Sequence, residues 1–185
     1  MSEATFNSQR CLSVVMPVYN EEATLEGVVR EVLKLPRLLE IVIVDDCSSD
    51  GTGEIAQRLT SESSSIVYRR HAKNKGKTEA LKTGFAATRG DIVIVQDADL
   101  EYDPNEIPLI IQPILDDRAD VVYGSRFLVR RATRVLYYYH YLGNRLLTTL
   151  SNIFTNLNMT DIETGYKAFR GDIIRDMVIK SRGFG

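Results

Sequence analysis

The sequence contains few of the residues that stabilise small proteins through disulfides or zinc. Among 185 residues there are two cysteines, Cys11 and Cys47, and two histidines, His71 and His140. Each cysteine lies beside an apolar run, so we expect both to be reduced thiols near the core. Neither histidine has partners at metal-ligand spacing, which argues against a zinc site built on them.

Long apolar runs and a strong net charge are also absent. No stretch approaches about 18 uninterrupted apolar residues, so the sequence predicts no transmembrane helix. The formal net charge is -2, which gives no general attraction to nucleic acid. We therefore expect no nucleic-acid partner, and we expect any anion binding to be local.

Two common phosphate-binding motifs are missing. Lys75-Gly76-Lys77-Thr78 resembles the end of a P-loop, but that motif needs a glycine at the position occupied by His71. No GxGxxG pattern is present to indicate a dinucleotide site. Lys77 therefore remains either a phosphate ligand or the solvated start of a helix.

The dominant pattern is an alternation of short apolar runs with helical periodicity. Continuous apolar runs predict strands that are covered on both faces, as in a parallel sheet; they are Leu12–Met16, Ile41–Val44, Ile66–Tyr68, Ile92–Val95 and Val121–Tyr123. We expect helices at about 21–35 with Asn20 as N-cap, at 52–59, at 77–88 and from Pro104 onward, where Pro108 and Pro113 should shorten or kink the helix. An amphipathic helix at about 142–157, a short strand at 164–169 and a last helix at 172–180 should follow. This order predicts one doubly wound α/β domain, with a mostly parallel sheet, over residues 1–185.

Carboxylates follow the fourth predicted strand in the stretch DIVIVQDADLEYDP. Side chains two residues apart in extended backbone point to the same side, so Asp97, Asp99 and Glu101 would converge. Clustered carboxylates suit Mg²⁺ or Mn²⁺, which typically bridges one or two of them to substrate phosphates. The alternative is a solvated turn that caps the next helix, which can account for Asp103.

Two adjacent aspartates, Asp45 and Asp46, follow the second predicted strand. Turn and cap chemistry accounts for Ser49, Asp50 and Gly51 without a ligand, but it does not account for two aspartates at a strand end. We expect one of them, Asp46 in preference to Asp45, to accept a hydrogen bond from a nucleobase or ribose.

Taken in order, these pieces resemble inverting family 2 glycosyltransferases of GT-A fold. The pieces are VVMPVYNEEATL, IVIVDDCSSDGT, NKGKTEALKTGF, DIVIVQDADLEYDP and DVVYGSRF. Within that family, GSRF, LGNRLLT and ETGYKAFR are similar to the dolichyl-phosphate mannosyltransferase-like branch, which transfers a sugar from a nucleotide sugar to a polyprenyl phosphate. The resemblance covers Leu12 to Gly185.

The resemblance implies a metal-dependent enzyme that uses GDP-mannose or a UDP-sugar as donor and a polyprenyl or dolichyl phosphate as acceptor. Residues from about 11 to 100 would bind the nucleotide sugar, and residues from about 101 to 185 the acceptor. The implied donor-binding residues are Pro17, Tyr19, Glu21, Asp46, Lys77, Asp97, Ala98 and Asp99. Mg²⁺ or Mn²⁺ would be held by Asp97, Asp99 and Glu101. The acceptor phosphate would be held by Arg126 and Arg145, and the candidate catalytic residues are Asp99 and Arg126.

Two other activities remain open. If the acceptor were a saccharide hydroxyl, as in cell-surface polysaccharide synthesis, a carboxylate base would be needed, and Asp161 is the candidate. The chain could instead be a catalytically silent nucleotide-binding protein. An aspartate-nucleophile phosphatase would carry its DxD on the first strand of its core, which argues against that class.

The family comparison also implies a location and a length. We expect the protein to act at the cytoplasmic face of a membrane through peripheral contact. Arg130, Arg131 and Arg134 would form a solvated basic loop that could face anionic lipid. Because family members usually continue past the position of Gly185, we expect a C-terminally truncated chain.

Overall fold

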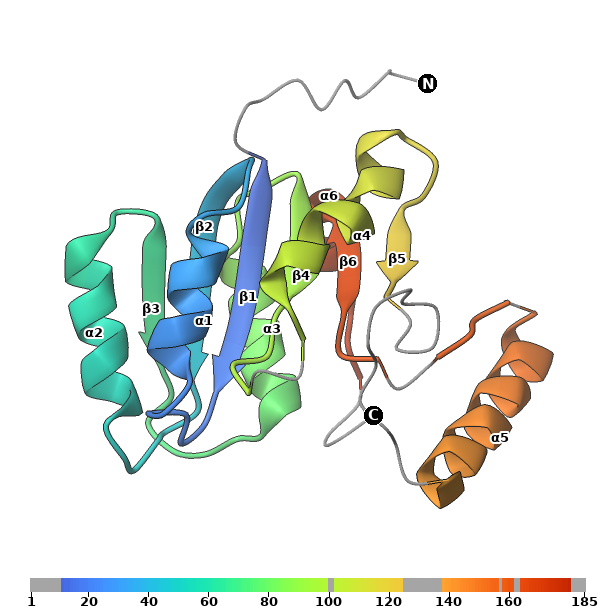
Figure 1. Cartoon of the computed structure of the whole chain (residues 1–185), viewed down its shortest axis with the longest axis horizontal. Helices are drawn as coiled ribbons and strands as arrows, with labels where there is room; N and C mark the ends of the chain where they lie inside the picture. Colours follow the sequence, from blue (N-terminus) through green and yellow to red (C-terminus); the bar gives the residue numbers. More distant parts are fainter. Residues whose placement is uncertain (1–10, 100–101, 125–137, 157, 162–163, 181–185) are drawn as a thin grey trace.

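The computed structural model describes residues 11–99, 102–124, 138–156, 158–161 and 164–180. Within these ranges six strands form one sheet in the order β3-β2-β1-β4-β6-β5 (Figure 1). The strands are β1 (Leu12–Val18), β2 (Leu38–Asp45), β3 (Ile66–Arg70), β4 (Ile92–Val95), β5 (Val121–Tyr123) and β6 (Lys167–Arg170). Strands β1 to β4 pair in parallel, whereas β6 runs antiparallel to both of its neighbours, β4 and β5. The predicted α/β fold with a mostly parallel sheet is confirmed.

Strand β4 is apolar at every position because both faces of the sheet are covered there. In β4, Ile92 and Ile94 pack into the core on one face, and Val93 and Val95 pack into the core on the other. All of these side chains are buried. Successive side chains of a strand point to opposite faces, so burial on both faces favours an apolar residue at each position of β4.

Helices form a layer on each face of the sheet (Figure 1). One layer contains α1 (Leu25–Val32), α2 (Thr52–Glu62) and α4 (Ile107–Leu115), which follows a short 3-10 turn, η1 (Pro104–Glu106). The other contains α3 (Lys77–Ala87) and α6 (Gly171–Asp176). Pro108 lies at the start of α4, where its missing N–H has no intrahelical partner to lose, and Pro113 lies inside this short helix.

The start of the first helix was predicted wrongly. The structure begins α1 at Leu25 with Thr24 as N-cap, and Asn20 has a left-handed φ of 57° that no helix start would use. The Asn20 side chain instead accepts a hydrogen bond from the Ser49 N–H at 2.9 Å. Tertiary contact between two loops therefore outweighs the local capping preference. Likewise, the last helix ends at Asp176, before the predicted limit, and the strand expected at 164–169 is β6.

Helix α5 (Tyr138–Thr155) occupies the region where an amphipathic helix was predicted. Its buried side chains include the polar residues Asn144 and Thr148, whereas the leucine, isoleucine and phenylalanine side chains described in this helix lie exposed. In Figure 1 the helix stands apart from the two layers that cover the sheet. The exposed apolar set consists of Leu142, Leu146, Leu147, Leu150, Ile153 and Phe154.

Within the described ranges, no helix combines the length and the hydropathy needed to cross a bilayer. Both cysteines are free, with Cys11 buried and Cys47 half-buried, as predicted.

Candidate functional site

The polar residues predicted from the sequence follow strands that end at one edge of the sheet. Strand β1 lies at the point where the strand order reverses, with β2 on one side of it and β4 on the other. In open α/β sheets, ligands bind in the crevice at such a switch point, beyond the carboxyl ends of the strands. The candidate site therefore lies beyond Val18, Asp45 and Val95.

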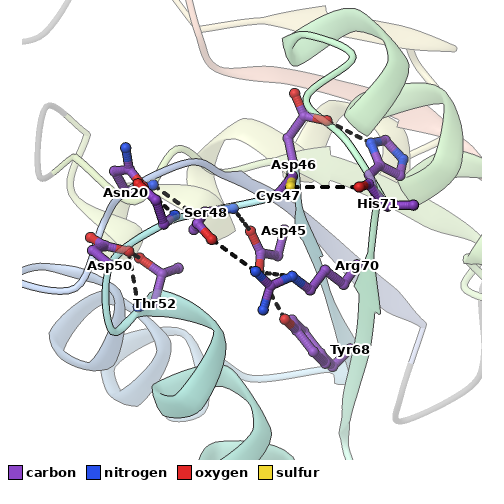
Figure 2. Close-up of polar contacts among 12 residues, drawn as sticks. Asn20, Asp45, Asp46, Cys47, Ser48, Asp50, Thr52, Tyr68, Arg70 and His71 are labelled. Carbon is purple, nitrogen blue, oxygen red and sulfur yellow. Dashed lines mark hydrogen bonds and ion pairs between the residues drawn. The ribbon is translucent and has the colours of Figure 1, made fainter.

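The turns that follow β1 and β2 are tied together by short polar groups (Figure 2). The Asn20 N–H donates to Ser48 Oγ at 3.0 Å, and the Asn20 side chain accepts from the Ser49 N–H. Thr52 Oγ1 accepts from the Glu21 N–H at 2.7 Å. These contacts fix the loop after β1 against the loop after β2, and both loops border the candidate site.

Asp45 is fully buried and is bonded to protein groups. Its Oδ1 accepts from the Ser48 N–H at 2.7 Å, and its Oδ2 accepts from the Tyr68 hydroxyl at 2.8 Å and lies 3.5 Å from Arg70 Nε (Figure 2). Burial, and then the hydrogen bond to Asp45, raise the pKa of Tyr68 to about 12. Asp45 therefore anchors the turn.

Asp46 is also buried, and its carboxylate holds the loop that leads into α3. Oδ1 lies 2.6 Å from His71 Nδ1 and accepts from the backbone N–H of Lys75 at 2.9 Å. Oδ2 accepts from the Gly76 N–H at 2.7 Å. The other His71 ring nitrogen lies 2.9 Å from Thr83 Oγ1. Burial by itself would raise the pKa of Asp46, but the His71 ring and the two backbone N–H groups together lower it. The ionised carboxylate thus organises the 71–76 loop.

The contact between Asp46 and His71 follows from the pairing of two strands. In the β2–β3 register Asp45 lies opposite Arg70, so the next residue of each strand lies side by side at the sheet edge. The sequence assigned His71 no functional role, because the two residues are far apart along the chain and have no motif in common. Only the parallel register brings them together.

Asp97, two residues after the end of β4, forms an ion pair with Lys77, the first residue of α3. Lys77 Nζ lies 2.6 Å from Asp97 Oδ1, and the Lys77 and Asp97 side chains are 38% and 14% exposed. Ala98 is buried and Asp99 is exposed. The structure therefore brings together two of the predicted donor-binding residues, one cationic and one anionic.

Lys167, at the start of β6, is a further charged residue at this edge that the sequence did not reveal. Its ammonium lies over the Tyr123 ring at 5.3 Å. Burial lowers the pKa of Lys167 and the charge of Lys77 lowers it further, while Asp161 and Asp97 oppose the shift. Two lysines and two aspartates therefore lie within electrostatic reach of one another. Lys167 lies in the ETGYKAFR piece, but no role was predicted for it, because only the antiparallel pairing of β6 with β4 brings it to this position.

Gly165 is packed against the carboxylate of Asp97. A Cβ at this position would lie 3.0 Å from Asp97 Oδ2 and 2.7 Å from the Tyr102 ring. The Gly165 N–H donates to the Tyr102 hydroxyl at 2.7 Å, and the Tyr102 ring packs against Tyr166 at 4.6 Å. The absence of a side chain at Gly165 thus leaves the space that Asp97 occupies.

The remaining predicted residues lie in β1 and the loop after it, on or beside α5, or outside the described ranges. Pro17, inside β1, is half-buried. In the loop after β1, Tyr19 is 50% exposed and Glu21 accepts from the Thr24 hydroxyl at 2.8 Å. Asp161 is buried and accepts from Asn144 of α5 at 2.8 Å. Arg145 is exposed on α5. The residues that lie outside the described ranges are Glu101, Arg126, Arg130, Arg131 and Arg134.

The carboxylates of this edge fit a Mg²⁺ or Mn²⁺ ion that is shared with a substrate. No group of three or more His, Cys, Asp or Glu side chains that could hold a metal is found in the part of the chain that the structure describes. Asp97 and Asp99 would supply one or two carboxylates, which is the number that Mg²⁺ usually takes when substrate phosphates complete its coordination. The carboxylates are thus suited to a metal held jointly with a ligand.

Comparison of the sequence with known protein families identifies the class to which this fold and candidate site belong. Residues 13–178 match glycosyl transferase family 2. The chain belongs to this family, which confirms the resemblance drawn from its motifs and the class of enzyme expected from them.

Curated relatives of known name cover most of the chain. It is 32% identical over 177 residues to a dolichol-phosphate mannosyltransferase of Pyrococcus furiosus, covering 94% of this chain and 50% of the relative. It is 36% identical over 172 residues to an undecaprenyl-phosphate 4-deoxy-4-formamido-L-arabinose transferase of Pseudomonas aeruginosa, covering 90% of this chain and 49% of the relative. The chain thus spans about half the length of these relatives.

Solved structures share the fold. A glucosyl-3-phosphoglycerate synthase from Mycobacterium tuberculosis, crystallised with Mn²⁺, UDP-glucose and phosphoglyceric acid, aligns with a TM-score of 0.64 and 26% identity, covering 89% of this chain and 58% of that one. A mannosyltransferase from Pyrobaculum calidifontis aligns with a TM-score of 0.63 and 18% identity, over 89% of this chain and 46% of that one, and shows the fold alone. The sheet of this chain is therefore of the GT-A type.

Proposed function

We propose that this chain carries the donor-binding part of a metal-dependent inverting glycosyltransferase that moves a sugar from a nucleotide diphosphate sugar to a polyprenyl phosphate. The observation that carries the proposal is the pairing of Asp97 with Lys77 at the switch point, beside Asp99. A nucleotide diphosphate needs both a carboxylate-held cation and a fixed ammonium, and this edge offers the groups for both.

The residues act on opposite ends of the donor. Pro17, Tyr19 and Glu21 line the nucleotide side, and Asp46 shapes that side by holding the backbone of Lys75 and Gly76. The Asp46 carboxylate already accepts hydrogen bonds from protein groups, so a ligand N–H that binds it would be an additional donor to the same oxygens. When bound, Mg²⁺ or Mn²⁺ neutralises charge on the departing diphosphate; its proposed ligands are Asp97, Asp99 and Glu101.

The acceptor assignment is supported by the names of the relatives and by α5. Both curated relatives are named for a polyprenyl or dolichol phosphate. The exposed leucines of α5 supply an apolar surface for peripheral contact at the cytoplasmic face of a membrane. A phosphate acceptor is already anionic at neutral pH and needs no strong base, and arginine holds phosphate well through its forked donors. Arg126 and Arg145 are the proposed phosphate ligands.

A saccharide hydroxyl is the second candidate acceptor, and the position of Asp161 is what favours it. The negative charges of Asp161 and Asp97 both act on the Lys167 ammonium, so Asp161 lies within electrostatic reach of the same lysine as Asp97. A hydroxyl acceptor needs a carboxylate base near the transferred sugar, whereas a phosphate acceptor does not. Labelled-sugar transfer to undecaprenyl phosphate or to a saccharide, with Asp161→Asn in parallel, separates the two: only transfer to a hydroxyl should depend on Asp161.

Nucleotide binding is the first test of the proposal. Thermal melts with UDP, GDP, CDP or AMP, each with Mn²⁺ and again with EDTA, should show stabilisation by one diphosphate that EDTA abolishes. Ligand at about 100 times its dissociation constant adds about 2.7 kcal/mol to the free energy of unfolding. Asp97→Ala should lose this shift, whereas Asp176→Ala, which removes an exposed carboxylate of α6, should keep it. A chain that no nucleotide stabilises would contradict the proposal.

A further inference from the structure

The ion pair between Lys77 and Asp97 links two residues that the proposed function assigns to different parts of one ligand. Asp97 is a proposed metal ligand, and Lys77 is a proposed phosphate ligand. The ammonium nevertheless lies 2.6 Å from Asp97 Oδ1, which is hydrogen-bond distance. An ammonium and a divalent cation cannot both occupy this position at one oxygen, because they repel each other and fill the same space.

The position of Lys77 is set by the loop that Asp46 holds. Gly76 precedes α3 with a left-handed φ of 87°, and its N–H donates to Asp46 Oδ2 at 2.7 Å. This contact fixes the backbone from which the Lys77 side chain extends. The side chain itself is long, flexible and 38% exposed, so the ammonium can move while the backbone stays in place.

We propose that Lys77 is an exchangeable counter-ion of Asp97. The ammonium neutralises the carboxylate until a divalent cation takes its place, and the displaced ammonium then pairs with the diphosphate of the donor. Each charge keeps a partner in both arrangements. Metal and diphosphate binding are therefore coupled through one lysine. The first half of this inference is the displacement of Lys77 from Asp97 by a divalent cation, and the second half is the pairing of Lys77 with the diphosphate. Only the second half rests on the proposed function.

The alternative is a permanent structural ion pair between the start of α3 and the end of β4. The two readings predict opposite effects of removing the lysine on the binding of metal alone. A competing ammonium weakens metal binding, so its removal should tighten it. A structural pair positions Asp97, so its removal should leave metal affinity unchanged or lower it.

The test is to titrate Mn²⁺ alone into wild type and Lys77→Gln, with free Mn²⁺ followed by electron paramagnetic resonance. Loss of a competing, partly exposed ion pair should tighten Mn²⁺ binding by about 2-fold to 5-fold. Lys77→Arg keeps a cation and should bind Mn²⁺ as weakly as wild type does. Lys73→Gln removes the same charge from an exposed position nearby and measures the general electrostatic effect. Thermal melts of each variant check that it is folded.

Titration of the stabilising nucleoside diphosphate at saturating Mn²⁺ tests the second half. Lys77→Gln should bind it about 10-fold more weakly, because the ammonium partner of the diphosphate is gone. Mn²⁺ affinity equal to or below that of wild type in folded Lys77→Gln would overturn the exchange, as would the absence of Mn²⁺ binding in both proteins. Tighter Mn²⁺ binding without any nucleotide binding would keep the exchange and reject the proposed function.

Discussion

Asp46 is a buried carboxylate whose charge is stabilised by neighbours that arrive from another strand. It receives the His71 ring and two backbone N–H groups of the 71–76 loop. The same loop carries Lys77, so one side chain positions both the nucleotide side of the edge and the lysine at Asp97. A group with this many donors contributes to stability only while it is ionised.

The first prediction concerns the pH dependence of that contribution. The pKa of Asp46 is lower in the folded protein than its ordinary value of 3.8. Its stabilisation is therefore complete above that ordinary value and is lost as the pH falls through the lowered folded-state pKa. The difference in free energy of unfolding between wild type and Asp46→Asn should be constant above about pH 5 and should shrink at lower pH. Urea melts at a series of pH values measure it.

Asp116→Asn is the control for this measurement. The pKa of Asp116 is also lowered, first by Gln112 and then by Arg118, but this carboxylate lies on the surface. Solvent screens such pairs, so the same trend should be much smaller. Equal pH dependence in the two variants would contradict a special role for the buried Asp46.

At the scale of elements, α3 lies close against the sheet because Gly84 has no side chain. A Cβ at Gly84 would come 2.3 Å from Val15 Cγ1 and 3.4 Å from Val44 Cγ2. The approach of the helix to β1 and β2 therefore depends on this residue. The same helix begins with Lys77, so its distance from the sheet also sets where Lys77 meets Asp97.

Gly84→Ala should destabilise the protein by about 1–3 kcal/mol, because the added methyl overpacks the interface between helix and sheet. The matched control is Gly27→Ala in α1, where a Cβ would meet nothing within 4 Å. Alanine is favoured over glycine in helices by about 1 kcal/mol, so Gly27→Ala should stabilise the fold. Urea unfolding measures both changes, and stabilisation by Gly84→Ala would show that the contact is loose.

At the scale of the whole molecule, charges are also buried at the edge opposite the candidate site. Glu40 of β2 is fully buried, accepts from Ser13 Oγ of β1 at 2.8 Å, and pairs with Arg89 at 2.8 Å. The Arg89 and Gly90 backbone N–H groups complete the cluster by donating to Glu40 and to Ser13. The cluster therefore joins the amino ends of three strands.

Glu40→Gln should lower the free energy of unfolding by about 1.5–3 kcal/mol, because buried hydrogen bonds to a charged group are lost. Metal and nucleotide affinity should stay unchanged, since the cluster lies at the opposite edge. Glu62→Gln removes a surface carboxylate that pairs with Arg58 at 3.0 Å and should cost less than about 1 kcal/mol. Denaturant melts compare the two variants, and similar losses would show that Glu40 acts as a surface charge.

Much of the fold could be predicted because its signals are local. Every strand expected from an apolar run was found, including β4, where both faces of the sheet demand apolar side chains. The gathering of the polar loops at one edge of the sheet could also be predicted, because the carboxyl ends of parallel strands lie at the same edge. The predicted start of α1 was wrong because the Asn20 side chain binds the neighbouring loop, a contact that no local preference encodes.

The candidate site could be predicted as a set of residues, but their contacts could not. Asp97 and Lys77 were both selected from sequence, while their ion pair depends on how α3 packs beside β4. His71 and Lys167 were missed because the register of β3 and the antiparallel return of β6 place them. The roles expected for Asp46, Asp97 and Asp99 stay predictions until binding is measured.

The sequence by itself determined the class of fold, the family and the edge where polar residues gather. These features depend on periodic burial and on short motifs, which the chain carries in contiguous segments. Tertiary structure alone decided that Asp46 holds a loop, that Lys77 meets Asp97, and that the leucines of α5 lie exposed. Such contacts join residues from different strands and helices, so they exist only once strand order, register and helix packing bring distant segments together.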